Sequence, residues 1–295
     1  MNEQPVVFEC AGESLVGIVS VPRGSPKLGV VILVGGPQYR VGSHRQFVLL
    51  ARRLAAGGAA VMRFDYRGMG DSAGASVPFD EIAPDVACAI DALAVACPSI
   101  DRVILCGLCD AASAALLYAH STHDARIAGL VLLNPWVGSE RARAAAYVKH
   151  YYTKRMLEAS FWRKLLAGGV DIGSAAAHLS RSIRRVLGSA GEPASRGGES
   201  LADRLGRALD GLTTPTLLLL SSDDLTAREF GEYSRARRRG ARLSACVEQH
   251  TVDADHTFAS SAARRRMEDL TAEWLHRTYP EPECLIASGG LLNID

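Results

Sequence analysis

Short apolar runs rich in Val, Ile and Leu alternate along the chain with segments whose apolar residues recur at helical spacing. Residues 6–12 and 15–22 predict an opening antiparallel hairpin with its turn at Gly12 and Glu13. Further strands are predicted over 29–36, 59–68, 102–107, 127–136, 214–222 and the start of 243–258. Helices are predicted over 45–58, 79–97, 110–121, 228–240 and 263–279. This alternation is typical of a mostly parallel, twisted sheet with helices on both faces.

The pattern changes after the sixth predicted strand. Residues 137–212 contain amphipathic helical pieces but no clear strand, and a Gly- and Ser-rich break interrupts them at 188–200. We therefore expect a core made of 1–136 and 213–279, a helical lid at 137–212 over the carboxyl ends of the strands, and a tail at 280–295.

Composition narrows the possible partners and the compartment. The 295 residues are 48% apolar and 22% charged with a formal net charge of +1, which gives a globular core and no field that favours nucleic acid. We expect no signal peptide and no membrane span, because the chain starts polar and its apolar runs are short. The 7 cysteines form no C-x-x-C pair, which argues against a metal site or a disulfide framework and favours the cytoplasm. We expect no cofactor.

The segment "VILCGLCDAASAALL" combines a strand, a sharp turn and a helix. Cys109 lies at the turn, with small residues at Gly107 and Ala111, as a nucleophile elbow requires. The helix N-terminus at this point favours a thiolate. The alternative is that Cys109 is a buried, inert thiol, which is the expected state of Cys106 within the strand.

Two downstream segments provide partners for such a nucleophile. Asp223 and Asp224 follow the 214–222 strand, and His256 lies in a loop before the last helix. Nucleophile, acid and histidine occur in this order along α/β-hydrolase chains. The order favours a triad in which the acid orients the histidine and the histidine accepts the proton of Cys109.

With these motifs the chain resembles an α/β-hydrolase over its whole length except the tail. The segment around "SSDDLTA" is similar to the family's acid segment and favours Asp224, with Asp223 as the alternative. "DADHTF" resembles the catalytic-histidine loop. The resemblance implies an oxyanion hole made of the backbone N–H groups of Asp110 and of Gly36, in the "VGGP" loop.

A narrower resemblance rests on "GGPQYRVGSHRQFVLLARRLA", "RFDYRGMGDS" and "GLCDAASAALLYA". Together they are similar to the cysteine-elbow hydrolases found beside exosortase A systems, which implies an association with export of cell-surface polymers. Candidate substrate-binding residues are Gln38, Tyr39, Arg40, His44 and Trp136. Of these, Arg40 or His44 contacts a polar or anionic part of the substrate. The alternative is that these side chains form hydrogen bonds within their own loop.

These residues predict a hydrolase that cleaves an acyl ester or thioester through a thioester on Cys109. A thiolate leaves a tetrahedral intermediate more easily than an amine does, so amides are poor substrates. The alternative is an acyltransferase that uses the same triad on a saccharide or a carrier-bound acceptor. A third possibility is a binding module that kept the fold. The expected partner is a small-molecule or carrier-linked acyl substrate.

Overall fold

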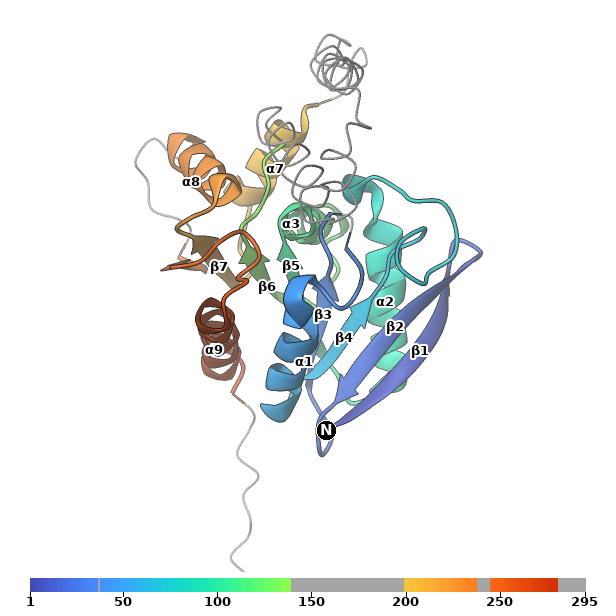
Figure 1. Ribbon diagram of the computed structural model, residues 1–295. Helices are drawn as coiled ribbons and strands as arrows, with labels where there is room; N and C mark the ends of the chain where they lie inside the picture. Colours follow the sequence, from blue (N-terminus) through green and yellow to red (C-terminus); the bar gives the residue numbers. More distant parts are fainter. Residues whose placement is uncertain (37, 139–198, 238–244, 281–295) are drawn as a thin grey trace, which may run out of the picture.

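The computed structural model describes residues 1–36, 38–138, 199–237 and 245–280, and Figure 1 shows them around one eight-stranded sheet. The strands are β1 (Asn2–Cys10), β2 (Glu13–Val21), β3 (Leu28–Leu33), β4 (Ala60–Phe64), β5 (Arg102–Leu108), β6 (Ile127–Leu133), β7 (Thr216–Ser221) and β8 (Val247–Val252). Their order across the sheet is β1-β2-β4-β3-β5-β6-β7-β8. The pairs β1–β2 and β2–β4 are antiparallel and the others are parallel.

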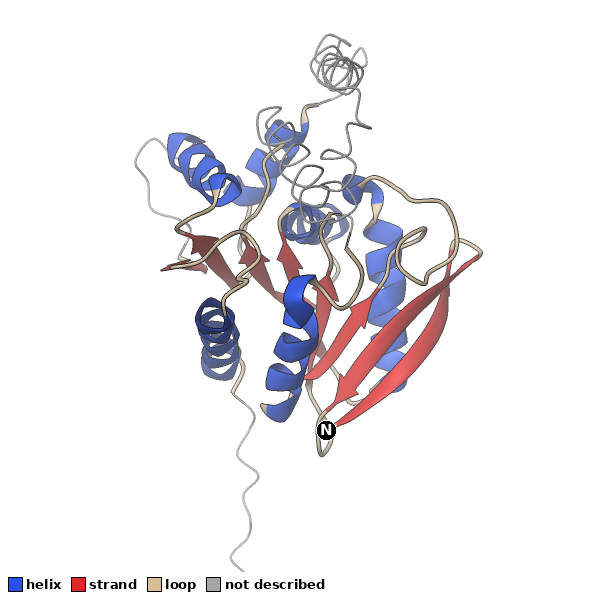
Figure 2. Ribbon diagram, viewed as in Figure 1, coloured by secondary structure: helices blue, strands red, loops and turns tan. Residues whose placement is uncertain are grey.

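Helices cover both faces of this sheet (Figure 2). They are α1 (Gln46–Ala56), α2 (Ala83–Ala96), α3 (Asp110–Thr122), α7 (Leu201–Asp210), α8 (Leu225–Arg237) and α9 (Ser261–Thr278), with short 3₁₀ turns η1 (Ser43–Arg45) and η2 (Phe79–Glu81). The helices α1 and α9 pack in one apolar cluster, and α2, α3, α7 and α8 pack in the other. The predicted α/β-hydrolase fold class is confirmed, since the central strands are buried on both sides as a parallel sheet requires.

The opening hairpin turns one residue earlier than predicted. Its two turn residues are Ala11 and Gly12, which both have positive φ, 53° and 82°. A two-residue turn with this geometry matches the twist of the flanking strands, which explains why Glu13 already belongs to β2.

The predicted lid lies largely outside the described residues. Of its C-terminal part, α7 packs Leu205, Ala208 and Leu209 into the same cluster as α3, so this helix covers the α3 face of the sheet. The predicted tail also lies outside the described residues, apart from Pro280.

The topology brings the ends of distant segments together. The strands β3, β5, β6, β7 and β8 run parallel to one another, so their carboxyl ends meet at one edge of the sheet. The candidate residues of the sequence follow these ends directly, and this edge holds the candidate active site.

Candidate active site

Cys109 lies in a sharp turn between β5 and α3. Its backbone has φ 62° and ψ −124°, a conformation that non-glycine residues rarely adopt. The turn is held in place because the Cys109 N–H donates to the Leu133 carbonyl (2.9 Å) and the Cys109 carbonyl accepts from the Trp136 N–H (3.2 Å). A Cβ on Gly107 would lie 2.5 Å from the Ala111 carbonyl oxygen, so the turn requires glycine there. The structure therefore has the backbone of a nucleophile elbow.

The histidine and one of the two candidate acids form a pair at the same edge. Nδ1 of His256 lies 2.8 Å from Oδ2 of Asp224, which follows β7. Asp224 also accepts from the N–H groups of Thr226 (3.2 Å) and Ala227 (3.1 Å). Burial alone would raise the pKa of Asp224, but the hydrogen bond and charge of His256 outweigh burial and lower it. Asp223 is exposed, and its side chain has no such partner among the described residues.

The loop that carries His256 is fixed from two sides. Oδ1 of Asp255 accepts from the N–H groups of Thr257 (3.1 Å) and Ala259 (3.0 Å), and the ring of Phe258 is buried. Asn134, which follows β6 and is fully buried, donates to the His256 carbonyl (3.0 Å). Asn134 also accepts from the Ser221 N–H (2.7 Å) at the end of β7. Asn134 therefore ties β6, β7 and the histidine loop together.

The surroundings of Cys109 raise the pKa of its thiol. Burial raises its pKa well above the ordinary value, and the charges of Asp110 and Asp224 raise it further. The N–H of Asp110 lowers the pKa, but by less. Burial therefore acts against the thiolate that the helix N-terminus would favour, and the expectation of a thiolate stays a prediction.

The expected oxyanion hole is partly occupied. Asp110 Oδ1 accepts from the N–H of Gly36 (2.8 Å) and from the N–H of Ala111 (2.9 Å). Among the described residues the N–H of Asp110 forms no hydrogen bond to a backbone carbonyl. Of the two expected donors, the N–H of Asp110 lies beside the Cys109 thiol, whose pKa it lowers, and the N–H of Gly36 is bound to the Asp110 carboxylate. The sequence predicts that the useful group of Asp110 is its backbone N–H and not its carboxylate; the structure places that carboxylate at the Gly36 N–H as well.

The loop after β3 is held together by its own hydrogen bonds. The guanidinium of Arg40 forms ion pairs with the fully buried Asp65 and with Asp71, and these bonds favour the alternative in which Arg40 acts within its loop. Oε1 of Gln38 accepts from the Ser43 N–H (3.0 Å). The side chains of Tyr39 and His44 are exposed. Their contact with substrate stays a prediction.

Trp136 lies next to the elbow. Besides its hydrogen bond to the Cys109 carbonyl, its ring packs edge-on against Phe79, with the ring centroids 5.4 Å apart. This packing connects the segment after β6 with η2. A role for Trp136 in an acyl pocket is compatible with this position and stays a prediction.

Comparison with known proteins identifies the family. The family model described as serine aminopeptidase, S33, matches residues 25–246, which is most of the chain. The chain belongs to this hydrolase family. The expectation that the protein is an enzyme of α/β-hydrolase type is thereby confirmed. No curated protein matches the chain.

Solved structures with the same fold as this S33-family chain come from several organisms. An esterase from Pyrococcus furiosus has a TM-score of 0.64 at 16% identity, covering 94% of this chain and 91% of its own. Est1E from Butyrivibrio proteoclasticus, solved with ferulic acid bound, has a TM-score of 0.59 at 16% identity, covering 92% and 99%. An α/β serine hydrolase without a lid from Xanthomonas campestris has a TM-score of 0.58 at 13% identity, covering 96% and 97%.

This S33-family chain carries cysteine at the elbow, although the family model is named for serine. The elbow geometry does not depend on this difference, because the backbone conformation and the neighbouring glycine set the turn. What the difference changes is the intermediate, which would be a thioester instead of an ester.

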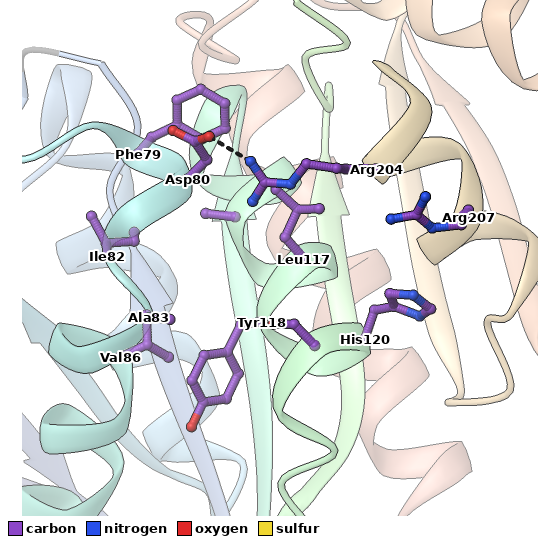
Figure 3. Close-up of a pocket in the computed structure, with 12 residues that line it drawn as sticks. Phe79, Asp80, Ile82, Ala83, Val86, Leu117, Tyr118, His120, Arg204 and Arg207 are labelled. Carbon is purple, nitrogen blue, oxygen red and sulfur yellow. Dashed lines mark hydrogen bonds and ion pairs between the residues drawn. The ribbon is translucent and has the colours of Figure 1, made fainter. Parts of the chain in front are cut away.

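A cavity of about 120 Å³ lies between η2, α2, α3 and α7 (Figure 3). Its apolar wall includes Phe79, Ile82 and Leu117, and an ion pair between Arg204 and Asp80 (2.8 Å) lies at its side. The α3 residues that line it begin at Ala114, more than a turn beyond Cys109. This cavity contains none of the triad residues.

Within the described part of the chain, no group of three or more His, Cys, Asp or Glu side chains is arranged to hold a metal ion. None of the described helices is both long and apolar enough to cross a membrane.

Asn134 is the positioning residue that the sequence analysis missed. The signal was present, because "LLNPW" places a polar residue directly after an apolar strand. Its function depends on Ser221 and His256, which are distant in sequence, and the pairing of β6 with β7 brings them together.

Proposed function

We propose that the protein hydrolyses acyl esters or thioesters with Cys109 as nucleophile, His256 as general base and Asp224 as the residue that orients the histidine. The observation that supports this best is the hydrogen bond of His256 to Asp224 at the same sheet edge as the strained Cys109 elbow. Because Nδ1 of His256 is bound to the carboxylate, Nε2 is the nitrogen that can accept a proton.

In the proposed reaction, His256 takes the thiol proton as Sγ of Cys109 attacks the acyl carbon. The carbonyl π electrons move to oxygen, and the N–H of Asp110, which follows the nucleophile, donates to this oxyanion. Collapse of the tetrahedral intermediate expels the alcohol or thiol, which receives its proton from His256, and leaves a thioester. Water, deprotonated by His256, then attacks the thioester and releases the acid and the Cys109 thiol.

The raised pKa of Cys109 supports general-base attack rather than attack by a preformed thiolate. A thiolate leaving group disfavours amide cleavage, so we propose esters or thioesters as substrates although the family is named for an aminopeptidase. The similarity to exosortase-associated sequences supports an acyl substrate connected with cell-surface polysaccharide.

The test is intact-mass spectrometry after incubation with p-nitrophenyl esters and acyl-CoA thioesters of several chain lengths. We expect an acyl adduct on the wild type, none on Cys109→Ala, and a normal adduct on Cys88→Ala, which removes a different half-buried thiol. An equal adduct on Cys109→Ala would overturn the proposal.

Transfer and hydrolysis are distinguished in the same assay. When a saccharide acceptor is added, a hydrolase releases free acid at an unchanged rate. An acyltransferase would form the acylated saccharide at the expense of the acid, and that result would replace hydrolysis by transfer with the same triad.

A further inference from the structure

The side chain of Asp110 lies between the elbow and the loop after β3. Its Oδ1 accepts from the Gly36 N–H (2.8 Å), a donor that an acyl oxyanion would use. A Cβ on Gly35 would lie 2.4 Å from this Oδ1 and 2.2 Å from the Leu108 carbonyl, so the glycine lets the loop approach the elbow closely. The carboxylate is therefore next to the position where the carbonyl of a substrate must bind.

Among the described residues, Asp110 forms no ion pair, unlike the buried carboxylates of this protein. The buried acidic residues are each paired with a basic side chain: Asp65 with Arg40, Asp85 with Arg67, Asp224 with His256, and Glu268 with Arg264, whereas Asp110 is half-buried. Within the described part of the chain, Asp110 forms no ion pair and receives hydrogen bonds only from backbone N–H groups. Burial raises its pKa, and the N–H donors of Gly36 and Ala111 together with the charge of His256, which is itself paired with Asp224, oppose this rise.

An unpaired negative charge at this position opposes the proposed reaction in two ways. It raises the pKa of the Cys109 thiol, and it repels the negative charge that develops on the substrate oxygen. The carboxylate and the oxyanion also compete for the same N–H of Gly36. A positive charge supplied by the substrate would remove both conflicts.

We propose that the Asp110 carboxylate binds an ammonium group that the substrate carries close to its acyl carbonyl, so that the enzyme selects acyl esters or thioesters with a cationic acyl chain. This inference rests on the proposed function and names the substrate class of the same site. The ammonium group neutralises the carboxylate and draws it away from Gly36, whose N–H then donates to the oxyanion.

The test uses two substrates of the same shape. One is the p-nitrophenyl ester of γ-trimethylammoniobutyrate, and the other replaces the trimethylammonium group by tert-butyl. The value measured is the ratio of kcat/KM for the cationic ester to that for the neutral ester. Asp110→Asn is the informative variant, because its amide oxygen can still accept from Gly36 and Ala111 while the charge is lost. Glu81→Gln removes an exposed carboxylate elsewhere and is the matched control.

We expect this ratio to fall at least about tenfold in Asp110→Asn, since a charge pair at a few ångströms in a partly desolvated site is worth at least that much. The ratio should be unchanged in Glu81→Gln. The two esters differ in intrinsic reactivity, but this difference contributes equally to the ratio in each variant and cancels when the ratios are compared. An equal ratio in the wild type and Asp110→Asn would overturn the inference.

A binding measurement separates this inference from the proposed function. If the wild type turns over neither ester, the hydrolase proposal fails for these esters, and γ-trimethylammoniobutyramide is then titrated calorimetrically into Cys109→Ala. Binding that is lost in Cys109→Ala with Asp110→Asn supports the cation site. If the amide binds equally well to both variants, or to neither of them, the proposed cation site is overturned.

Discussion

Replacing Cys109 by glycine should stabilise the fold while it removes the proposed nucleophile. With φ 62° and ψ −124°, Cys109 has a backbone conformation that is strained for any residue with a Cβ. Such strain costs about 1–3 kcal/mol. Glycine relieves it, at an entropic cost of about 0.5–1 kcal/mol compared with alanine.

The comparison that isolates the strain is Cys109→Gly against Cys109→Ala, because both variants lose the sulfur and its contacts. The difference in the free energy of unfolding should be about 0.5–2 kcal/mol in favour of glycine. For a domain of this size, this corresponds to a rise in Tm of about 1–8 °C.

Urea unfolding followed by circular dichroism measures this difference, with unchanged m-values as a check that the unfolding transition is the same. His123, which is exposed and has φ 48° at the end of α3, provides the matched control pair His123→Gly and His123→Ala. If glycine is more stabilising than alanine at position 123 but not at position 109, the backbone of Cys109 is not strained and the argument is refuted.

The thiol and the charged groups lead to further predictions. The rate of alkylation of Cys109 by iodoacetamide in the native protein should be low near neutral pH, because the pKa of the thiol is raised, and it should increase about tenfold per pH unit up to about pH 9. A rate that levels off below about pH 7 would indicate a preformed thiolate. Asp224→Asn should lower kcat by about 10²–10⁴-fold. Folding lowers the pKa of Asp224, so the wild type should be more stable than this variant by a constant amount above about pH 4. As the pH falls further, this difference in the free energy of unfolding, measured by urea unfolding, should decrease. A difference that does not depend on pH would contradict the prediction. Arg40→Ala should lower the free energy of unfolding by about 3–5 kcal/mol, because it leaves the buried Asp65 without its partner. The control Arg102→Ala, which breaks an exposed pair, should lower it by about 0–1 kcal/mol. A rise in KM for Arg40→Ala with unchanged stability would instead show that Arg40 contacts the substrate.

Local sequence patterns were sufficient to predict the helices and strands and the order of the candidate residues along the chain. The alternation of apolar runs and helical segments predicts the parallel sheet, because a buried strand must be apolar on both faces. The spacing around Cys109 predicts the elbow, since Gly107 contacts residues only a few positions away and its requirement is local.

The preference for Asp224 over Asp223 came from resemblance, and the fold supplies the physical reason for it. Asp224 is buried and faces His256, whereas Asp223 next to it is exposed. Consecutive residues in the turn after β7 point to different sides, and only the path of the chain after the strand decides which of them meets the histidine loop.

The sequence by itself determined the type of fold and the proposed identities of nucleophile, base and acid, because strand periodicity, turn residues and chain order are local or one-dimensional properties. Only the tertiary structure decided the electrostatics of the site. Burial of Cys109 raises the pKa of its thiol, and the Asp110 carboxylate meets the Gly36 N–H across 74 positions of sequence. Desolvation and contacts between distant residues arise from the packed sheet edge as a whole, so no short segment contains the information that sets them.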